Sequence, residues 1–226
     1  MTETATRAQS AWGNAAEGEP RWPASLALLV ALALYVTLPY KLTIGPPWTV
    51  ALLELALIVP LSIMAPRRGS SEARWHRVTA IFLIAVINAA NFVSLILLVH
   101  FLLLHGSKAT AAQLLFSSLE IWLTNIIVFA LWYWELDRGW PTARASQRHR
   151  QPDFLFPQMV TPGCAPGHWY PRFMDYLYLA FTNATAFSPT DTLPLTAGAK
   201  LLMLVQALTS LLTVALVAAR AVNILA

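Results

Sequence analysis

Long apolar stretches alternate with short polar segments over most of the chain. A helix needs about 20 apolar residues to cross the roughly 30 Å hydrocarbon core of a membrane. Five stretches approach or exceed this length, and each predicts a membrane-spanning helix. They are Pro23–Tyr40, Trp48–Ala65, Val78–Leu104, Thr110–Trp134 and Thr196–Leu225.

A shorter apolar stretch, Phe173–Thr192, precedes the last predicted span. It begins with aromatic residues, becomes small and polar, and is broken at Ser188-Pro189. A helix over Asp175–Ala186 would be about 18 Å long, too short to cross the membrane comfortably. Together with Pro171 and the proline break, this length favours a half-helix that enters the membrane and returns to the same side. The alternative is a sixth crossing.

These elements predict an all-α integral membrane protein with five transmembrane helices and a re-entrant half-helix, or with six transmembrane helices. The expected organisation is a disordered cytoplasmic tail at 1–20, a four-helix transmembrane region at 21–135, a cytoplasmic loop at 136–172, and the half-helix with the last span at 173–226. Composition supports this class, because 57% of the residues are hydrophobic and 12% are charged. An ordinary soluble domain carries about 25% charged residues.

Basic residues concentrate on one side of the predicted spans. The loop Pro66–Arg77 carries four arginines, the loop Glu135–Arg172 carries five, and the N-terminal tail adds two more. Opposite them lie Lys41 and Lys108. Because cytoplasmic loops are enriched in Lys and Arg, the N-terminus and both long loops are expected in the cytoplasm, with the protein in the inner membrane. The half-helix then enters from the cytoplasmic side.

Lys200 lies near the start of the last predicted span, and three further charged residues lie deeper inside spans: Glu54, Glu120 and Arg220. Burying such groups in lipid is costly unless they are paired, so each is a functional candidate. If the half-helix returns, all three fall in the outer half of the membrane, and Glu120 is expected close to Arg220. The alternatives are a structural pair or triad, or a proton-transport role for the two glutamates.

Uncharged polar residues also gather on single helix faces. In the last span, Gln206, Ser210, Thr213 and Arg220 form a stripe that faces away from the Leu and Val positions. Similar stripes are formed by Asn88 and Asn91 in the third span and by Gln113, Ser117, Glu120 and Thr124 in the fourth. Such stripes imply an interior that is hydrated or densely hydrogen-bonded. The same groups can also simply hold membrane helices together.

Motifs for enzymatic chemistry are absent from the sequence. Serine-nucleophile, zinc-protease and phosphate-loop patterns are missing, and Cys164 is the single cysteine. His100, His105 and His168 have no histidine or carboxylate at ligand spacing, and His76 and His149 lie in basic loops, so neither a metal nor a cofactor is expected. The net charge of +4 lies mainly on loops and does not indicate nucleic-acid binding. The aromatic segment Trp132–Glu135 predicts an interfacial belt.

The C-terminal quarter contains a set of short motifs: Asp175-Tyr176-Leu177-Tyr178, Phe181-Thr182, Ser188 with Asp191, and Val222-Asn223. Through these motifs the C-terminal quarter of the chain resembles the last segment of an uncharacterised bacterial family of short multi-pass membrane proteins. More distantly, the arrangement resembles the pore module of potassium-channel-like proteins. That module has an outer helix, a short pore helix rich in threonine at its end, a filter, an aspartate and an inner helix.

The second resemblance implies pore-helix and post-filter positions for Thr182, Thr185 and Asp191. The stretch Thr185–Pro189 contains no glycine, however, so potassium selectivity is not implied. The carboxyl end of a half-helix still carries about half a negative charge, which favours a cation.

We therefore expect a channel-like homo-oligomer in the lipid bilayer that conducts an inorganic cation. The pore-lining candidates are Thr182, Asn183, Thr185, Ser188, Asp191, Gln206, Ser210 and Thr213. The alternatives are a non-conducting scaffold or accessory subunit, and a proton-coupled carrier using Glu54 and Glu120.

Overall fold

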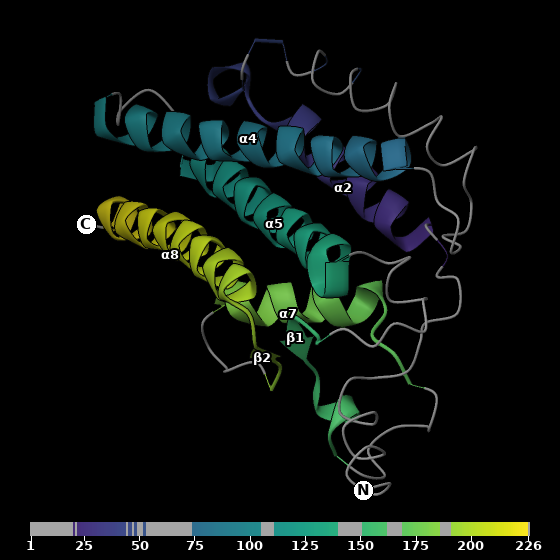
Figure 1. Cartoon of the computed structure of the whole chain (residues 1–226). Helices are drawn as coiled ribbons and strands as arrows, with labels where there is room; N and C mark the ends of the chain where they lie inside the picture. The colour runs from purple at the N-terminus through teal and green to yellow at the C-terminus, as the bar shows by residue number, and fades with distance from the viewer. Residues whose placement is uncertain are drawn as a thin grey trace, which may run out of the picture.

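The structure is a computed structural model that describes residues 20, 22–43, 45–46, 48, 52, 74–104, 111–139, 151–161, 169–185 and 191–225. Its α-helices are α2 (Trp22–Thr37), α4 (Arg74–Leu104), α5 (Ala111–Leu136), α7 (Phe173–Thr185) and α8 (Ala197–Leu225), shown in Figure 1. The short elements are η1 (Tyr40–Leu42), η2 (Asp137–Gly139), β1 (Phe154–Leu155), η3 (Pro157–Met159) and β2 (Leu193–Pro194). The predicted all-α class is confirmed for the described residues.

Within the part of the chain that the structure describes, three helical segments are long and apolar enough to cross a membrane: Arg77–Leu102, Ala112–Gly139 and Ala197–Ala218. They match the third, fourth and last predicted spans. The first predicted span is a shorter apolar helix of 16 residues, α2, followed by the η1 turn. The second predicted span and the N-terminal tail lie outside the described residues, apart from Pro20, Trp48 and Leu52.

Helix α5 is the centre of the helical group and contacts α2, α4, α7 and α8 (Figure 1). Its last turns are covered on every side: Tyr133, Trp134 and Glu135 are at most 2% exposed. The Trp134 ring meets Phe173 of α7 edge-on, and the Tyr133 ring meets Phe154 of β1. The prediction of an interfacial aromatic belt is therefore wrong for these three residues, because α7 and the loop before it cover this end of α5.

The segments that precede and follow α7 lie at the same end of the helical group. Strand β1 precedes α7 and β2 follows it, and the two pair antiparallel, with Phe154 opposite Pro194. The backbone N–H of Leu195 also donates to the Asp153 carbonyl over 2.8 Å. Helix α8 therefore begins where α5 ends and runs back along it.

Candidate functional site

Side chains from α5, α7 and α8 meet in a polar cluster within this largely apolar group of helices. We define the Gln206 cluster as Asn125, Tyr133, Asn183, Gln206 and Ser210. Gln206 is fully buried. Its Oε1 accepts hydrogen bonds from the Tyr133 hydroxyl at 2.5 Å and from Asn183 Nδ2 at 2.8 Å. Its Nε2 donates to the Ala180 carbonyl of α7 at 2.8 Å.

The other amides of the cluster extend these links between helices. Asn183 Nδ2 also donates to the Met203 carbonyl of α8 at 3.0 Å. Asn125 Nδ2 donates to Ser210 Oγ at 2.8 Å and lies 3.4 Å from the Gln206 carbonyl oxygen. Buried polar groups in an apolar surrounding require such partners, so these bonds hold α7 in place between α5 and α8.

Helix α7 slopes from the end of α5 into the helical group. Near its start, the Tyr176 hydroxyl donates to Asp137, just past the end of α5, at 2.6 Å. Near its other end, Asn183 bonds to the seventh and tenth residues of α8, which lie about 9–14 Å along that helix. The Phe181 ring meets Trp122 with centroids 6.1 Å apart, about four turns before α5 ends. The carboxyl end of α7 therefore lies deeper than its start.

Most of the predicted pore-lining residues point into the protomer. Gln206, Ser210 and Thr213 are at most 1% exposed, and Thr182 is also buried. The Thr213 hydroxyl donates to a carbonyl of its own helix, and so does that of Thr182. The half-buried Asn183 is taken up by the Gln206 cluster. These groups therefore hydrogen-bond within the chain, to their own or to neighbouring helices, and the lining role predicted for them stays a prediction.

Two lining candidates lie nearer the surface, on either side of segment 186–190. Thr185 is the last residue of α7 and half-buried, and its hydroxyl donates to the Thr182 carbonyl at 3.0 Å. Asp191 is exposed just before β2. Ser188 and the rest of the segment between them lie outside the described residues.

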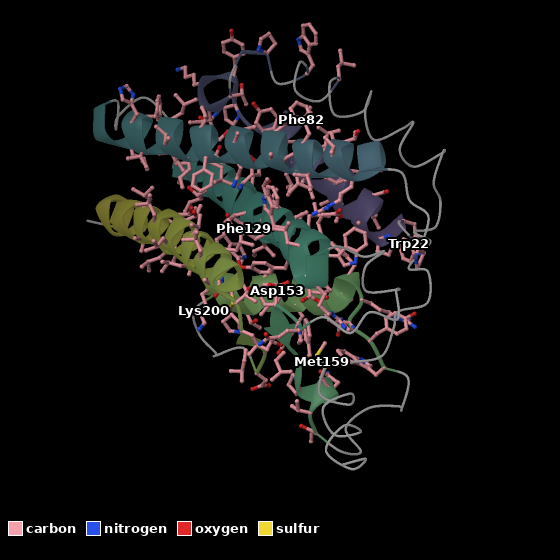
Figure 2. All side chains as sticks on the ribbon, viewed as in Figure 1. Trp22, Phe82, Phe129, Asp153, Met159 and Lys200 are labelled. Atoms are coloured by element: carbon pink, nitrogen blue, oxygen red, sulfur yellow. The ribbon has the colours of Figure 1, made fainter. Side chains whose placement is uncertain are left out.

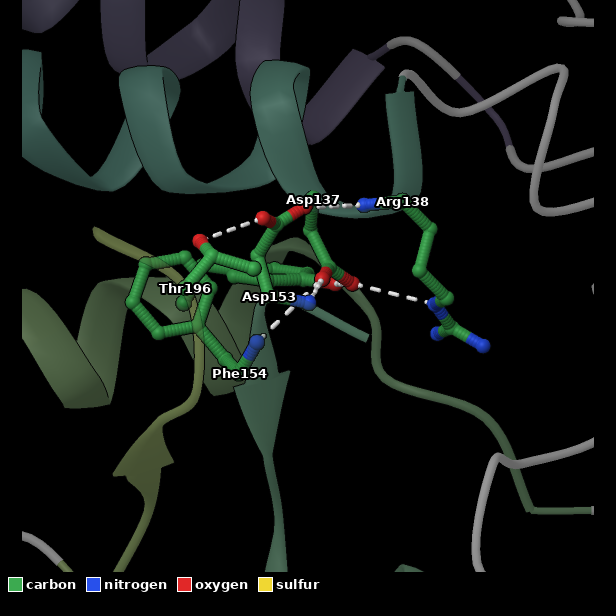
Figure 3. A network of polar contacts seen from close by, with 6 residues as sticks. Asp137, Arg138, Asp153, Phe154 and Thr196 are labelled. Atoms are coloured by element: carbon green, nitrogen blue, oxygen red, sulfur yellow. Dashed lines mark hydrogen bonds and ion pairs between the residues drawn. The ribbon is translucent and has the colours of Figure 1, made fainter. Parts of the chain in front are cut away.

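A second polar cluster lies where α5 ends and α8 begins (Figure 3). We define the Asp137 cluster as Asp137, Arg138, Asp153, Tyr176 and Thr196. Asp137 is fully buried. Its Oδ1 accepts from the backbone N–H of Asp153 at 2.9 Å and of Phe154 at 3.4 Å. Its Oδ2 accepts from the Tyr176 hydroxyl at 2.6 Å and from Arg138 Nε at 3.2 Å.

Asp153 connects this cluster to the start of α8. One of its carboxylate oxygens accepts from the Arg138 backbone N–H at 2.7 Å, and the other accepts from the Thr196 hydroxyl at 2.6 Å. The Thr196 hydroxyl oxygen in turn accepts from the Ala199 N–H, as an N-cap residue does. Arg138 has a φ of 53°, in the left-handed region that few non-glycine residues adopt, and this lets the chain turn sharply after α5.

The Asp137 cluster was not expected from the sequence, because its first three members lie in a stretch that was assigned as a polar cytoplasmic loop. A threonine directly before the last apolar stretch is the one local signal that points to it, since such a residue is typical of a helix N-cap. The pairing of Asp137 with Asp153 has no sequence signature.

The predicted intramembrane charges are only partly described. Glu120 is half-buried and lies close to Thr37 at the end of α2, whose hydroxyl donates to the Ala33 and Leu34 carbonyls of its own helix. Glu54 and the side chain of Arg220 lie outside the described residues, so the Glu120–Arg220 pair stays a prediction. Among the described residues, no three His, Cys, Asp or Glu side chains gather in a group that could hold a metal ion.

Comparison of the chain with protein-family models, with curated proteins and with solved structures finds no match.

Proposed function

We propose that the chain is a multi-pass membrane protein with a channel-like module formed by α5, α7 and α8, in which α7 is a re-entrant half-helix. The observation that carries this proposal is the path of α7. It starts beside Asp137, slopes inward to Gln206, and is followed by a strand back at the first end. Short helices that end inside the membrane are a recurring way to present a helix end to an ion. Three long apolar helices provide the surrounding frame.

In this proposal the Gln206 cluster positions the half-helix, and the lining is confined to its end. The carboxyl end of α7 directs about half a negative charge toward the interior, which favours a cation beside Thr185. Asp191 adds a carboxylate on the returning segment. One chain supplies one half-helix, so an axial pore requires a homo-oligomer. The arginine-rich loops favour a cytoplasmic N-terminus at the inner membrane, with the segments that precede and follow α7 on the cytoplasmic side as well.

Reconstitution into planar bilayers tests conduction directly. We expect cation currents whose conductance or ion preference changes in Thr185→Val and Asp191→Asn. The matched control is Thr213→Val, which removes the same hydroxyl from a buried position and should leave the currents unchanged. Silent bilayers from folded, oligomeric protein would contradict conduction, and a monomer in nanodiscs would contradict an axial pore.

A non-conducting scaffold or accessory subunit is the second candidate, and one observation favours it. The members of the Gln206 cluster hydrogen-bond to one another within a single protomer, as expected of groups that only hold helices together. This candidate predicts silent bilayers together with a stable membrane partner that co-purifies. Loss of that partner in Asp191→Asn with no change in folding would place the contact at the end of the half-helix.

A further inference from the structure

An apolar groove of about 670 Å³ lies between α2 and the beginning of α7. Leu26 and Val30 of α2 form one wall, and Met174 and Leu177 of α7 form the other. Three of these side chains are open to the surroundings, with 52% of Leu26, 43% of Val30 and 70% of Met174 exposed. The volume falls within the roughly 300–1,000 Å³ typical of sites for small ligands.

The rim of this groove carries a positive charge and aromatic rings. Arg172 is the charged residue of the described lining, and its guanidinium lies over the Tyr170 ring, 5.3 Å from the centroid. Trp22 adds a second, largely exposed ring at the amino end of α2. Trp and Tyr are enriched where a membrane meets water, and Arg binds phosphate oxygens through paired N–H donors.

We propose that this groove binds an anionic phospholipid of the cytoplasmic leaflet. One acyl chain lies between α2 and α7 against Leu26 and Val30, and the headgroup phosphate bonds to Arg172. An acyl chain needs no hydrogen-bond partner in an apolar groove, whereas a peptide segment there would bury unpaired backbone groups. The guanidinium at the rim complements a negative headgroup, and the inner leaflet supplies such lipids. This inference rests on the membrane placement proposed above.

Native mass spectrometry of the full chain with added lipid tests the site. Phosphatidylglycerol and phosphatidylcholine with the same acyl chains are titrated separately. We expect the wild type to bind phosphatidylglycerol about tenfold more tightly, because the choline ammonium of phosphatidylcholine offsets the phosphate charge beside Arg172, and we expect Arg172→Gln to lose that preference. Glutamine keeps the backbone N–H that donates to Asp175 at the start of α7. Lys200→Gln is the control, because it removes an exposed cation on the opposite side of the molecule from Trp22 (Figure 2).

A second variant tests the groove itself. Val30→Trp fills the space from an exposed position and is expected to weaken binding of both lipids at least about tenfold. The proposal is overturned if Arg172→Gln keeps the preference for phosphatidylglycerol, if Lys200→Gln loses it equally, or if Val30→Trp binds both lipids like the wild type. Dimers that form in the wild type and are lost in Val30→Trp would assign the groove to a second copy instead.

Carbonate extraction of membranes distinguishes a failure of the lipid site from a failure of the membrane placement on which it rests. Release of the protein into the supernatant would contradict the membrane placement and the lipid site together. Protein that stays in the membrane but shows no Arg172-dependent lipid preference contradicts the lipid site alone.

Discussion

Replacing Gln206 with methionine keeps the length and flexibility of the side chain but removes all of its hydrogen bonds. Three of these bonds join α8 to other helices: one to Tyr133 of α5 and two to α7, at Asn183 and Ala180. After the change, Asn183 still donates to the Met203 carbonyl. The Tyr133 hydroxyl loses its 2.5 Å acceptor in a position with 0% exposure.

The expected loss follows from the number of bonds. Side-chain hydrogen bonds between membrane helices contribute about 0.6 kcal/mol on average and up to about 1.7 kcal/mol. Three of them predict that Gln206→Met lowers the free energy of unfolding by about 2–5 kcal/mol. Because the bonds hold α7 to α8 at both Ala180 and Asn183, we expect α7 to be held less firmly against α8 in the less stable variant.

Reversible unfolding in mixed detergent micelles measures this free energy. The matched control is Thr209→Val, one turn along α8, which is also buried but bonds only to the Val205 carbonyl of its own helix. Bonds of that kind contribute little to helix stability, so the control should stay close to the wild type. Equal stability of Gln206→Met and Thr209→Val would refute the claim that the cluster fixes α7.

Three further predictions concern the carboxylates. Asp137→Ala should lower the free energy of unfolding by about 3–5 kcal/mol, because Arg138 and two backbone N–H groups lose a buried acceptor. Thermal unfolding measures this loss. The exposed Asp191→Ala is the control and should unfold like the wild type. Burial raises the pKa of Asp175, and the bond and charge of Arg172 oppose this only in part. The native state therefore holds this proton more tightly than the unfolded chain, and stability should fall as pH rises from the ordinary carboxyl range through the raised pKa. Asp175→Asn should flatten that part of the unfolding profile, and an unchanged slope would contradict the assignment. If the protein is a proton-coupled carrier, vesicles should show flux driven by a pH gradient that Glu120→Gln abolishes, and equal flux in both proteins would exclude that role for Glu120.

The long helices could be predicted from the sequence because their apolar runs carry the signal locally. Helix α4 ends at Leu104 as predicted, and α5 and α8 begin within one residue of their predicted starts. The inward-facing stripe of α8 was also predictable, since Gln206, Ser210 and Thr213 are buried while the intervening leucines are largely exposed. Gln206 and Ser210 hydrogen-bond to α5, and Gln206 also bonds to α7.

The contacts that surround α7 could not be predicted in the same way. Strands of two residues have no periodicity, so the β1–β2 pair leaves no pattern in the sequence. Asp137 and Asp153 meet only because the chain turns sharply at Arg138. The aromatic end of α5 matches an interfacial belt in composition, and only the packing of α7 and β1 against it explains its burial.

The path of α7 is the central claim, and the sidedness of its two flanks tests it most directly. In a Cys164→Ser background, single cysteines replace Gln151, before α7, and Asp191, after it; both positions are exposed. Sealed right-side-out and inside-out vesicles are then treated with a maleimide that does not cross membranes. A re-entrant α7 predicts that both cysteines are labelled from the same side, the cytoplasmic one. Labelling of the two positions from opposite sides would show that α7 crosses the membrane and would contradict the account.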